Sequence, residues 1–449
     1  MTRNTKNLVD WDREHIVHGR YPIGGNAGLV TERAEGVYFY DTDGKRYLDA
    51  SSQLISVNLG YGNAEVIDAI KKQAEKLQYG MLFYGFSNTP IVECGKALSK
   101  VVPPGLDHFA FTAGGSEAVD SAIKISRYYW HARGLPKFKI ISLYDAYHGV
   151  TRDALSATAS ARGSMERGLG AGQAGFIHVP PYYCYRCMLG LDYPSCGIRC
   201  AHILEDVILK EGAEFVSAFL AEGEMGVGGM VAPPPEYWPI VRDICTRHGV
   251  LMIDDEVMSG FCRTGKMFAI DHWGVKPDIM TMAKGITSSY IPFGAVAFTA
   301  DIWNTIKGVS IVSHTYAGHP IGAAAATRTI EVYLRDRIAE RTLEMGEYAL
   351  SRFKKFKLPW VGEANGLGLM LGIEIVADRA TKKPFDPRLG IMQKIQDMAK
   401  AKGLWIRVAT LQGTLSDRVC FCPPLIITKK ELDWAIDTLY DVLSEIKPK

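Results

Sequence analysis

The chain has 449 residues, with 51 Lys and Arg against 49 Asp and Glu, a net charge of +2 and 47% hydrophobic residues. The near-neutral balance, without basic runs, argues against a nucleic-acid binder, because phosphate contacts dominate that kind of affinity. Apolar stretches fall short of the roughly 18 residues that a membrane helix needs. Nine cysteines, an odd number, and a polar N-terminus without the apolar core of a signal peptide predict a soluble cytoplasmic protein with reduced thiols.

The N-terminal region predicts a hairpin followed by a helix. Residues 36–50 alternate aromatic and polar side chains around Asp43-Gly44, a pair that tolerates the positive φ of a tight turn. Residues 63–78 carry apolar side chains at helical spacing, and Asn63 is a suitable N-cap.

The middle of the chain alternates short apolar runs with helical patterns such as residues 116–134 and 235–249. The apolar runs lack polar alternation, as expected of strands buried on both faces. They lie at residues 108–112, 138–143, 216–222, 249–256, 278–284 and 292–299. Strand–helix repetition of this kind predicts an α/β fold with a mostly parallel sheet, whose functional residues lie at the carboxyl ends of the strands.

A long helical pattern begins near residue 319, and an amphipathic helix over 429–446 ends the chain. We expect a large domain over residues 61–330. A smaller α+β domain would combine residues 1–60 with residues 331–449.

Two ionisable groups follow neighbouring apolar runs. One run ends in Asp254-Asp255-Glu256, and the next ends at Lys284. Desolvation at a strand end favours the neutral amine of a lysine, which can then form a Schiff base with a carbonyl. A carboxylate beside it can hold a pyridine nitrogen in its protonated form. The alternative is that Asp255 caps a helix and Lys284 merely starts one.

Three other segments favour a phosphorylated cofactor. Gly115 and Ser116 follow a strand and open a helix, where free N–H groups and the helix dipole attract a phosphate. Tyr147 follows another strand and could stack on a planar ring. Thr315 lies among hydroxyl-bearing residues before the long helix.

The ordered segments GGSEA, YHG, DDEVMSGFCRTG, AKG and HTYAGHP resemble the class III aminotransferases, which are pyridoxal-phosphate enzymes of fold type I. The resemblance implies that Lys284 is the Schiff-base lysine and proton shuttle and that Asp255 pairs with the ring nitrogen. Val257 would pack behind the ring, Tyr147 would stack on its front face, and Gly115 and Ser116 would bind the phosphate. Thr315 would reach the phosphate of a neighbouring subunit, so the resemblance implies a homodimer with shared sites. Whether dimers combine into a tetramer is left open.

Within that family, SQLISVNLGYG and FYGFSNTP resemble the ω-amino acid and amine:pyruvate branch. This implies transfer of an amino group from an ω-amino acid or primary amine to a keto acid, with pyruvate as the default acceptor. Ile55 stands where relatives often have tryptophan, and Phe86 lies in the second segment; both would contact substrate. Arg407 matches an arginine that binds substrate carboxylates, with Arg418 as a rival. Val227 stands where the ornithine and 4-aminobutyrate branches carry glutamate, which argues against those substrates.

Other functions stay open at this point. The same cofactor would serve an aminomutase or a decarboxylase. Cys184, Cys187, Cys196 and Cys200 form a Cys-x2-Cys-x8-Cys-x3-Cys pattern that could hold zinc or an iron–sulfur cluster, or could be free thiols or a chance disulfide. A non-catalytic protein using this cluster for metal-dependent binding is therefore a third alternative. We assign no metal ligand to the active site.

Overall fold

The computed structural model describes residues 3–19, 25, 29–159, 172–311, 313–411 and 416–446. Its largest sheet has seven strands in the order β4-β10-β9-β8-β7-β5-β6. In chain order, these strands are β4 (His108–Thr112), β5 (Lys139–Leu143), β6 (Phe176–Val179), β7 (Val216–Ala221), β8 (Leu251–Asp255), β9 (Ile279–Met282) and β10 (Gly294–Phe298).

The strand directions confirm the predicted α/β class. Each neighbouring pair from β9 through β8, β7 and β5 to β6 is parallel, whereas β10 runs antiparallel to both β9 and β4. Every residue of β7, β8, β9 and β10 is buried, because other elements cover both faces of the sheet. That burial explains the unbroken apolar runs in the sequence.

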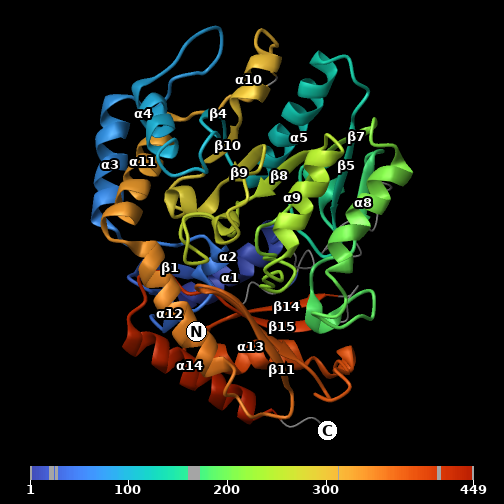
Figure 1. Cartoon of the computed structure of the whole chain (residues 1–449). Helices are drawn as coiled ribbons and strands as arrows, with labels where there is room; N and C mark the ends of the chain where they lie inside the picture. The colour runs from blue at the N-terminus through green and yellow to red at the C-terminus, as the bar shows by residue number, and fades with distance from the viewer. Residues whose placement is uncertain are drawn as a thin grey trace.

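Helices surround this sheet, and α11 leads from it toward the C-terminal part of the molecule (Figure 1). In chain order they are α3 (Ala64–Lys76), α4 (Thr89–Leu98), α5 (Gly115–Ala132), α6 (Arg152–Ala157), η1 (Cys184–Arg186), α8 (Arg199–Glu211), α9 (Tyr237–Arg247), η2 (Ala269–His272), η3 (Lys284–Thr287), α10 (Ala300–Ile306) and α11 (Pro320–Arg335). Asn63 caps α3 as predicted, because its side chain accepts hydrogen bonds from the N–H groups of Glu65 and Val66.

The two ends of the chain share a four-stranded sheet of order β1-β2-β3-β13. Its strands are β1 (Thr31–Glu35), β2 (Tyr38–Asp41), β3 (Arg46–Asp49) and β13 (Leu404–Trp405). The predicted hairpin is β2 with β3, and β13 pairs with β3 in parallel. This pairing supports a small domain built from both ends of the chain; its exact limits stay a prediction.

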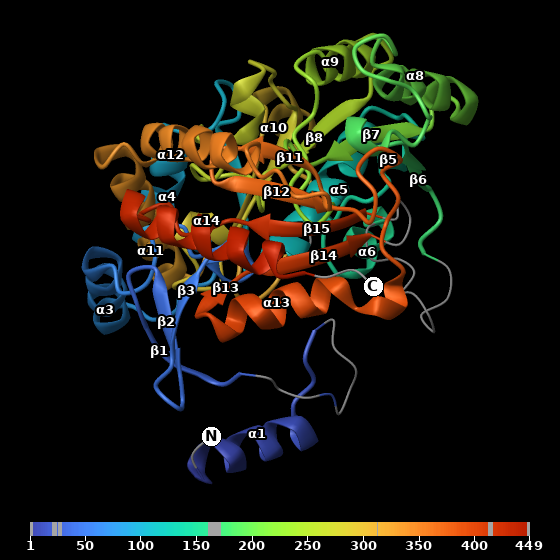
Figure 2. The ribbon, with the colours of Figure 1, turned by 90° about the horizontal axis from the view of Figure 1, so that it is seen from below.

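A second four-stranded sheet, of order β11-β12-β15-β14, lies beside the C-terminal helices (Figure 2). The strands are β11 (Val361–Leu367), β12 (Met370–Ile375), β14 (Arg407–Leu411) and β15 (Ser416–Phe421). The remaining helices are α1 (Arg3–His15), α2 (Ser52–Ile55), α12 (Ile338–Phe353), η4 (Pro387–Leu389), α13 (Ile391–Ala401) and α14 (Lys429–Ser444).

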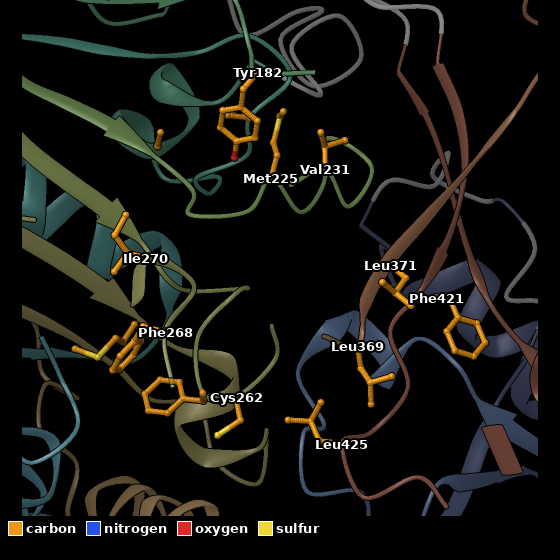
Figure 3. Packing of buried hydrophobic residues seen from close by; sticks show 14 of the residues in the cluster. Tyr182, Met225, Val231, Cys262, Phe268, Ile270, Leu369, Leu371, Phe421 and Leu425 are labelled. Carbon is orange, nitrogen blue, oxygen red and sulfur yellow. The ribbon is translucent and has the colours of Figure 1, made fainter. Parts of the chain in front are cut away.

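A loop over residues 225–231, which follows β7, packs between the large sheet and the sheet of β11, β12, β15 and β14. Met225 and Val231 pair through their backbones at its two ends. Figure 3 shows their side chains beside Tyr182, with Leu371 and Phe421 across from them on strands of the second four-stranded sheet. These residues belong to one hydrophobic core, which therefore runs from the large sheet into the small one.

Candidate active site

The predicted lysine and carboxylate meet at the carboxyl ends of β8 and β9. Asp255 ends β8, and Lys284 follows β9 after a single residue. Both side chains line a cavity of about 140 Å³. The cavity is lined by Gly115, Ser116, Tyr147, His148, Gly149, Glu222, Asp255, Val257, Met258 and Lys284. Six of the seven residues predicted to bind the cofactor thus line one cavity, whereas Thr315 does not. Four further lining residues were not predicted.

Asp255 is held by three groups that fix its carboxylate. His148 Nδ1 lies 2.7 Å from one of its oxygens, and the Thr281 hydroxyl donates to the other at 2.9 Å. The Val257 N–H also donates to that second oxygen, at 3.1 Å. Thr281 faces Asp255 because the parallel register of β8 and β9 places them opposite each other. Asp255 is 2% exposed, so this aspartate is oriented before any ligand arrives.

The N-terminus of α5 forms the opposite end of the cavity. Gly114 is its N-cap and offers no side chain, which leaves the first N–H groups of an 18-residue helix open to an anion. A Cβ added to Gly115 would lie 2.6 Å from Val257 Cγ1, so only glycine fits between the helix and that side chain. The Ser116 hydroxyl accepts a hydrogen bond from the Val150 N–H at 3.1 Å. This combination suits a phosphate group.

The residues around the cavity fit pyridoxal phosphate by the chemistry of each group. The helix end supplies donors for a phosphate, the oriented carboxylate matches a protonated ring nitrogen, and the lysine matches an aldehyde. Tyr147 contributes an aromatic ring, as predicted. Its backbone N–H donates to Glu222 at 3.2 Å.

Two of the unanticipated residues are ionisable. His148 contacts the carboxylate of Asp255 through its side chain, and its Nε2 has no hydrogen-bond partner among the described residues. Burial, with a smaller contribution from the nearby Asp255, raises the pKa of Glu222 to about 7, and His148 acts in the opposite direction. The histidine of YHG and the glutamate directly after β7 were visible in the sequence as polar residues at strand ends.

An apolar cluster adjoins the cavity on the side of the small domain. It contains the predicted substrate residue Ile55, which is 1% exposed, and it packs against Tyr147. We call it the substrate-side cluster; its buried members are Ile55, Val227, Met230, Met258, Met370, Ala409, Cys420 and Cys422. Met258 belongs both to this cluster and to the cavity lining, so the two are continuous.

The two candidate arginines occupy different environments. Arg418, on β15, is fully buried and contacts Tyr183 and Glu374. Arg407, on β14, is partly exposed, and its charge acts on the thiols of Cys420 and Cys422 in the substrate-side cluster. No hydrogen bond or ion pair of the Arg407 side chain occurs among the described residues. Arg407 thus has the free cation that carboxylate binding requires, and Arg418 does not.

Phe86 and Thr315 stand apart from the chain's own cavity. Phe86 is 61% exposed, and Thr315 is exposed as well. Their segments nevertheless pack together, because the Tyr79 hydroxyl donates to the Thr315 carbonyl at 3.0 Å and the Asn88 side chain donates to the Gly318 carbonyl at 3.2 Å.

The four clustered cysteines line one narrow cavity between η1 and the start of α8. All nine cysteines of the chain are free. Burial raises the pKa of Cys184 to about 12 and that of Cys200 to about 11, which keeps these thiols protonated at neutral pH. Over the ranges that the structure describes, no three His, Cys, Asp or Glu side chains are arranged to hold a metal ion. None of the helices in these ranges is both long and apolar enough to cross a membrane.

Comparison with known proteins agrees with this geometry. The family profile for Aminotransferase class-III matches residues 23–443. The putrescine–pyruvate aminotransferase of Pseudomonas aeruginosa is 35% identical over 91% of this chain and 88% of its own length. The adenosylmethionine-8-amino-7-oxononanoate aminotransferase of Geobacter sulfurreducens is 33% identical over 97% of each chain.

A solved structure, a thermostable (S)-enantioselective omega-transaminase from Thermomicrobium roseum, matches with a TM-score of 0.93 and 38% identity over 99% of both chains. The fold and the site thus define an enzyme that works with pyridoxal phosphate on an α/β fold of type I. The chain belongs to the class III aminotransferases, as the resemblance in its sequence implied.

Proposed function

We propose that this enzyme transfers an amino group from a primary amine or ω-amino acid to a keto acid, with pyruvate as the acceptor and alanine as its product. One observation carries the proposal: Lys284, the oriented Asp255 and the N-terminus of α5, which can bind a phosphate, all line one cavity. Bound pyridoxal phosphate supplies an aldehyde that condenses with amines and a ring that stabilises negative charge on the adjacent carbon.

The chain's own residues divide the work. Lys284 Nζ would hold the cofactor's aldehyde, and as a neutral amine it would move a proton at the substrate carbon. Asp255, fixed by His148 and Thr281, would keep the ring nitrogen protonated. Gly115 and Ser116 would hold the phosphate at the start of α5, and Val257 and Tyr147, which line the same cavity, would contact the ring.

The substrate side supports a donor with an apolar body. Ile55 and its neighbours in the substrate-side cluster present aliphatic and sulfur-bearing side chains. Glu222, a carboxylate of the cavity lining, accepts from the backbone N–H groups of Gly226 and Tyr147, so it is already engaged. Arg407 supplies a partly exposed cation for the carboxylate of the keto acid. A relative named for pyruvate as its acceptor supports the same choice.

We further propose a homodimer in which Phe86 and Thr315 complete the site of the neighbouring subunit. Both residues are exposed on adjoining segments, and neither lines the cavity of its own chain. Tyr84 and Tyr316, on the same segments, are 91% and 61% exposed, which is typical of a surface that another protein covers. The nine free cysteines support the predicted cytoplasmic location.

One experiment tests the proposed reaction. Purified holoenzyme is incubated with pyruvate and a panel of ω-amines, and alanine is measured. Alanine formation is expected for at least one donor. Rearranged amine without alanine would favour an aminomutase, and released carbon dioxide would favour a decarboxylase. Borohydride reduction with peptide mapping tests the covalent link, which is expected at Lys284.

A further inference from the structure

Arg418 sits at the centre of a buried polar network that joins the cysteine-bearing segment to the small domain. The Tyr183 hydroxyl donates to Glu374 at 2.7 Å, and the Ser416 hydroxyl donates to the same oxygen at 2.7 Å. Arg418 contacts both Tyr183 and Glu374, the latter at 3.5 Å. Arg186 binds the other oxygen of Glu374. Glu374 and Arg418 are both fully buried, so their charges must be compensated by ion pairs within this network.

The other side of Arg418 faces the loop over residues 225–231. A Cβ added to Gly229 would lie 2.2 Å from Arg418 Cδ, and Gly229 has a φ of +109°. The Met230 carbonyl lies 3.5 Å from Arg418 Nη2. The Gly229 carbonyl in turn lies against Gly372 on β12, where an added Cβ would come within 2.2 Å of it. The loop backbone therefore rests directly on the arginine and on the strand beside it.

The same loop carries two walls of the substrate-side cluster. Val227 and Met230 are 6% and 0% exposed and pack in that cluster with Ile55 and Met258. Tyr147, on the cofactor side, packs against the same cluster. A shift of the Gly229–Met230 backbone would move both side chains, because protein interiors transmit small displacements rather than absorbing them.

We propose that Arg418 is a positioning residue: clamped by Tyr183 and Glu374, it holds the Gly229–Met230 backbone and thereby sets how Val227 and Met230 wall the amine-binding side of the site. The inference rests on the proposed function, which places the amine at this cluster. It gives Arg418 a role in amine selection without contact with any substrate carboxylate. The cysteine-bearing segment contributes through Tyr183 and Arg186.

The test uses holoenzyme and measures amine binding from the absorbance change of the bound cofactor, so it does not depend on turnover. Tyr183→Phe removes one hydroxyl of the clamp, and a neutral hydrogen bond is worth roughly 0.5–1.5 kcal/mol. We expect the Kd for a series of unbranched primary amines to rise about 2- to 10-fold, the range that this energy gives. The Kd for pyruvate, measured on the pyridoxamine form, should change by less than about twofold, which corresponds to less than 0.5 kcal/mol. The reason is that Arg418 does not contact the substrate carboxylate in this proposal.

Gly229→Ala approaches the same contact from the loop side. It should also raise the amine Kd selectively, because the added methyl group must displace Arg418 or the loop. Gly105→Ala is the matched control, since Gly105 has a φ of +99° but no atom within 4 Å of an added Cβ. Arg418→Met and Arg418→Lys extend the series if they fold; Tyr183→Phe and Gly229→Ala decide the question if they do not.

The possible results distinguish a positioning role of Arg418 from direct carboxylate binding. Selective loss of amine binding in Tyr183→Phe and Gly229→Ala, but not in Gly105→Ala, supports the proposal. A selective rise in the Kd for pyruvate in the Arg418 or Tyr183 variants would overturn it and make Arg418 a carboxylate ligand. Unchanged amine binding in both Tyr183→Phe and Gly229→Ala would also overturn it. Wild-type holoenzyme that binds amines but forms no alanine would instead refute the proposed acceptor reaction.

Discussion

His148 Nδ1 lies 2.7 Å from Asp255 Oδ2 in a pair that solvent barely reaches. The histidine follows β5 and the aspartate ends β8, so the fold brings them together at one edge of the large sheet. The Thr281 hydroxyl donates a hydrogen bond to the other oxygen of the carboxylate. Asp255 is thereby restrained from two sides, so its orientation in the cavity depends on His148 and Thr281.

Replacing this histidine should slow catalysis without unfolding the enzyme. Hydrogen bonds to charged groups contribute roughly 1.5–3 kcal/mol, so His148→Phe should lower kcat about 10- to 150-fold. Thr281→Val removes a weaker donor and should have a smaller effect. Steady-state kinetics measures both, with His131→Phe, at an exposed position near the end of α5, as the control. Unchanged kcat in His148→Phe would show that Asp255 does not depend on His148.

One methyl group added at the N-terminus of α5 should weaken binding of the cofactor phosphate. Gly115→Ala places its Cβ 2.6 Å from Val257 Cγ1, so cofactor affinity should fall at least 10-fold, a loss of about 1.4 kcal/mol. Gly114→Ala is the neighbouring control, because no atom lies within 4 Å of its added Cβ. The double variant Gly115→Ala/Val257→Ala should recover part of the affinity. Equilibrium dialysis of pyridoxal phosphate distinguishes these cases; equal losses at Gly114 and Gly115 would contradict the steric explanation.

Lys284 should be indispensable for turnover but not for folding. Lys284→Ala removes both the covalent anchor and the proton carrier, and we expect kcat to fall at least 10³-fold, or about 4 kcal/mol of barrier. Lys284 has a φ of +47°, and alanine is a smaller L-residue at the same position, so the variant should still fold. Lys266→Ala, at an exposed position, is the control. Activity retained in Lys284→Ala would remove the basis of the proposed mechanism.

Glu222 predicts a specific pH dependence of stability. Burial raises its pKa to about 7 in the folded protein, so the folded state keeps a proton that the unfolded chain releases near its ordinary value of 4.5. Stability should therefore fall as pH rises through that window, by about 3 kcal/mol from this group alone.

Urea unfolding of cofactor-free protein measures this effect from pH 4.5 to 8. Glu256 also has a raised pKa and contributes in the same direction, so the comparison is between wild type and Glu222→Gln. The variant should show a shallower decline than wild type. Parallel pH profiles for the two proteins would mean that Glu222 is ionised in the folded state throughout.

The sequence predicted the cofactor half of the site better than the substrate half. Asp255 and Lys284 follow consecutive apolar runs, and parallel strands bring such ends to one edge. The support from Thr281 depends on the register of β8 and β9, which short apolar runs do not specify. The substrate-side cluster collects residues from Ile55 to Cys422, and Glu374 meets Tyr183 only through packing between distant segments. Such contacts have no local pattern to reveal them.

The cavity and the substrate-side cluster draw on different parts of the protein. The cavity is lined by the start of α5 and by residues at or just after the ends of β5, β7, β8 and β9, whereas Met370, Ala409 and Cys420 lie on β12, β14 and β15. If the proposed function holds, we expect changes in β12, β14 and β15 to alter amine binding while leaving the residues of the cavity intact. We expect that remodelling β12, β14, β15 and the loop over residues 225–231 would change the range of donors. That sheet is therefore the natural target for engineering.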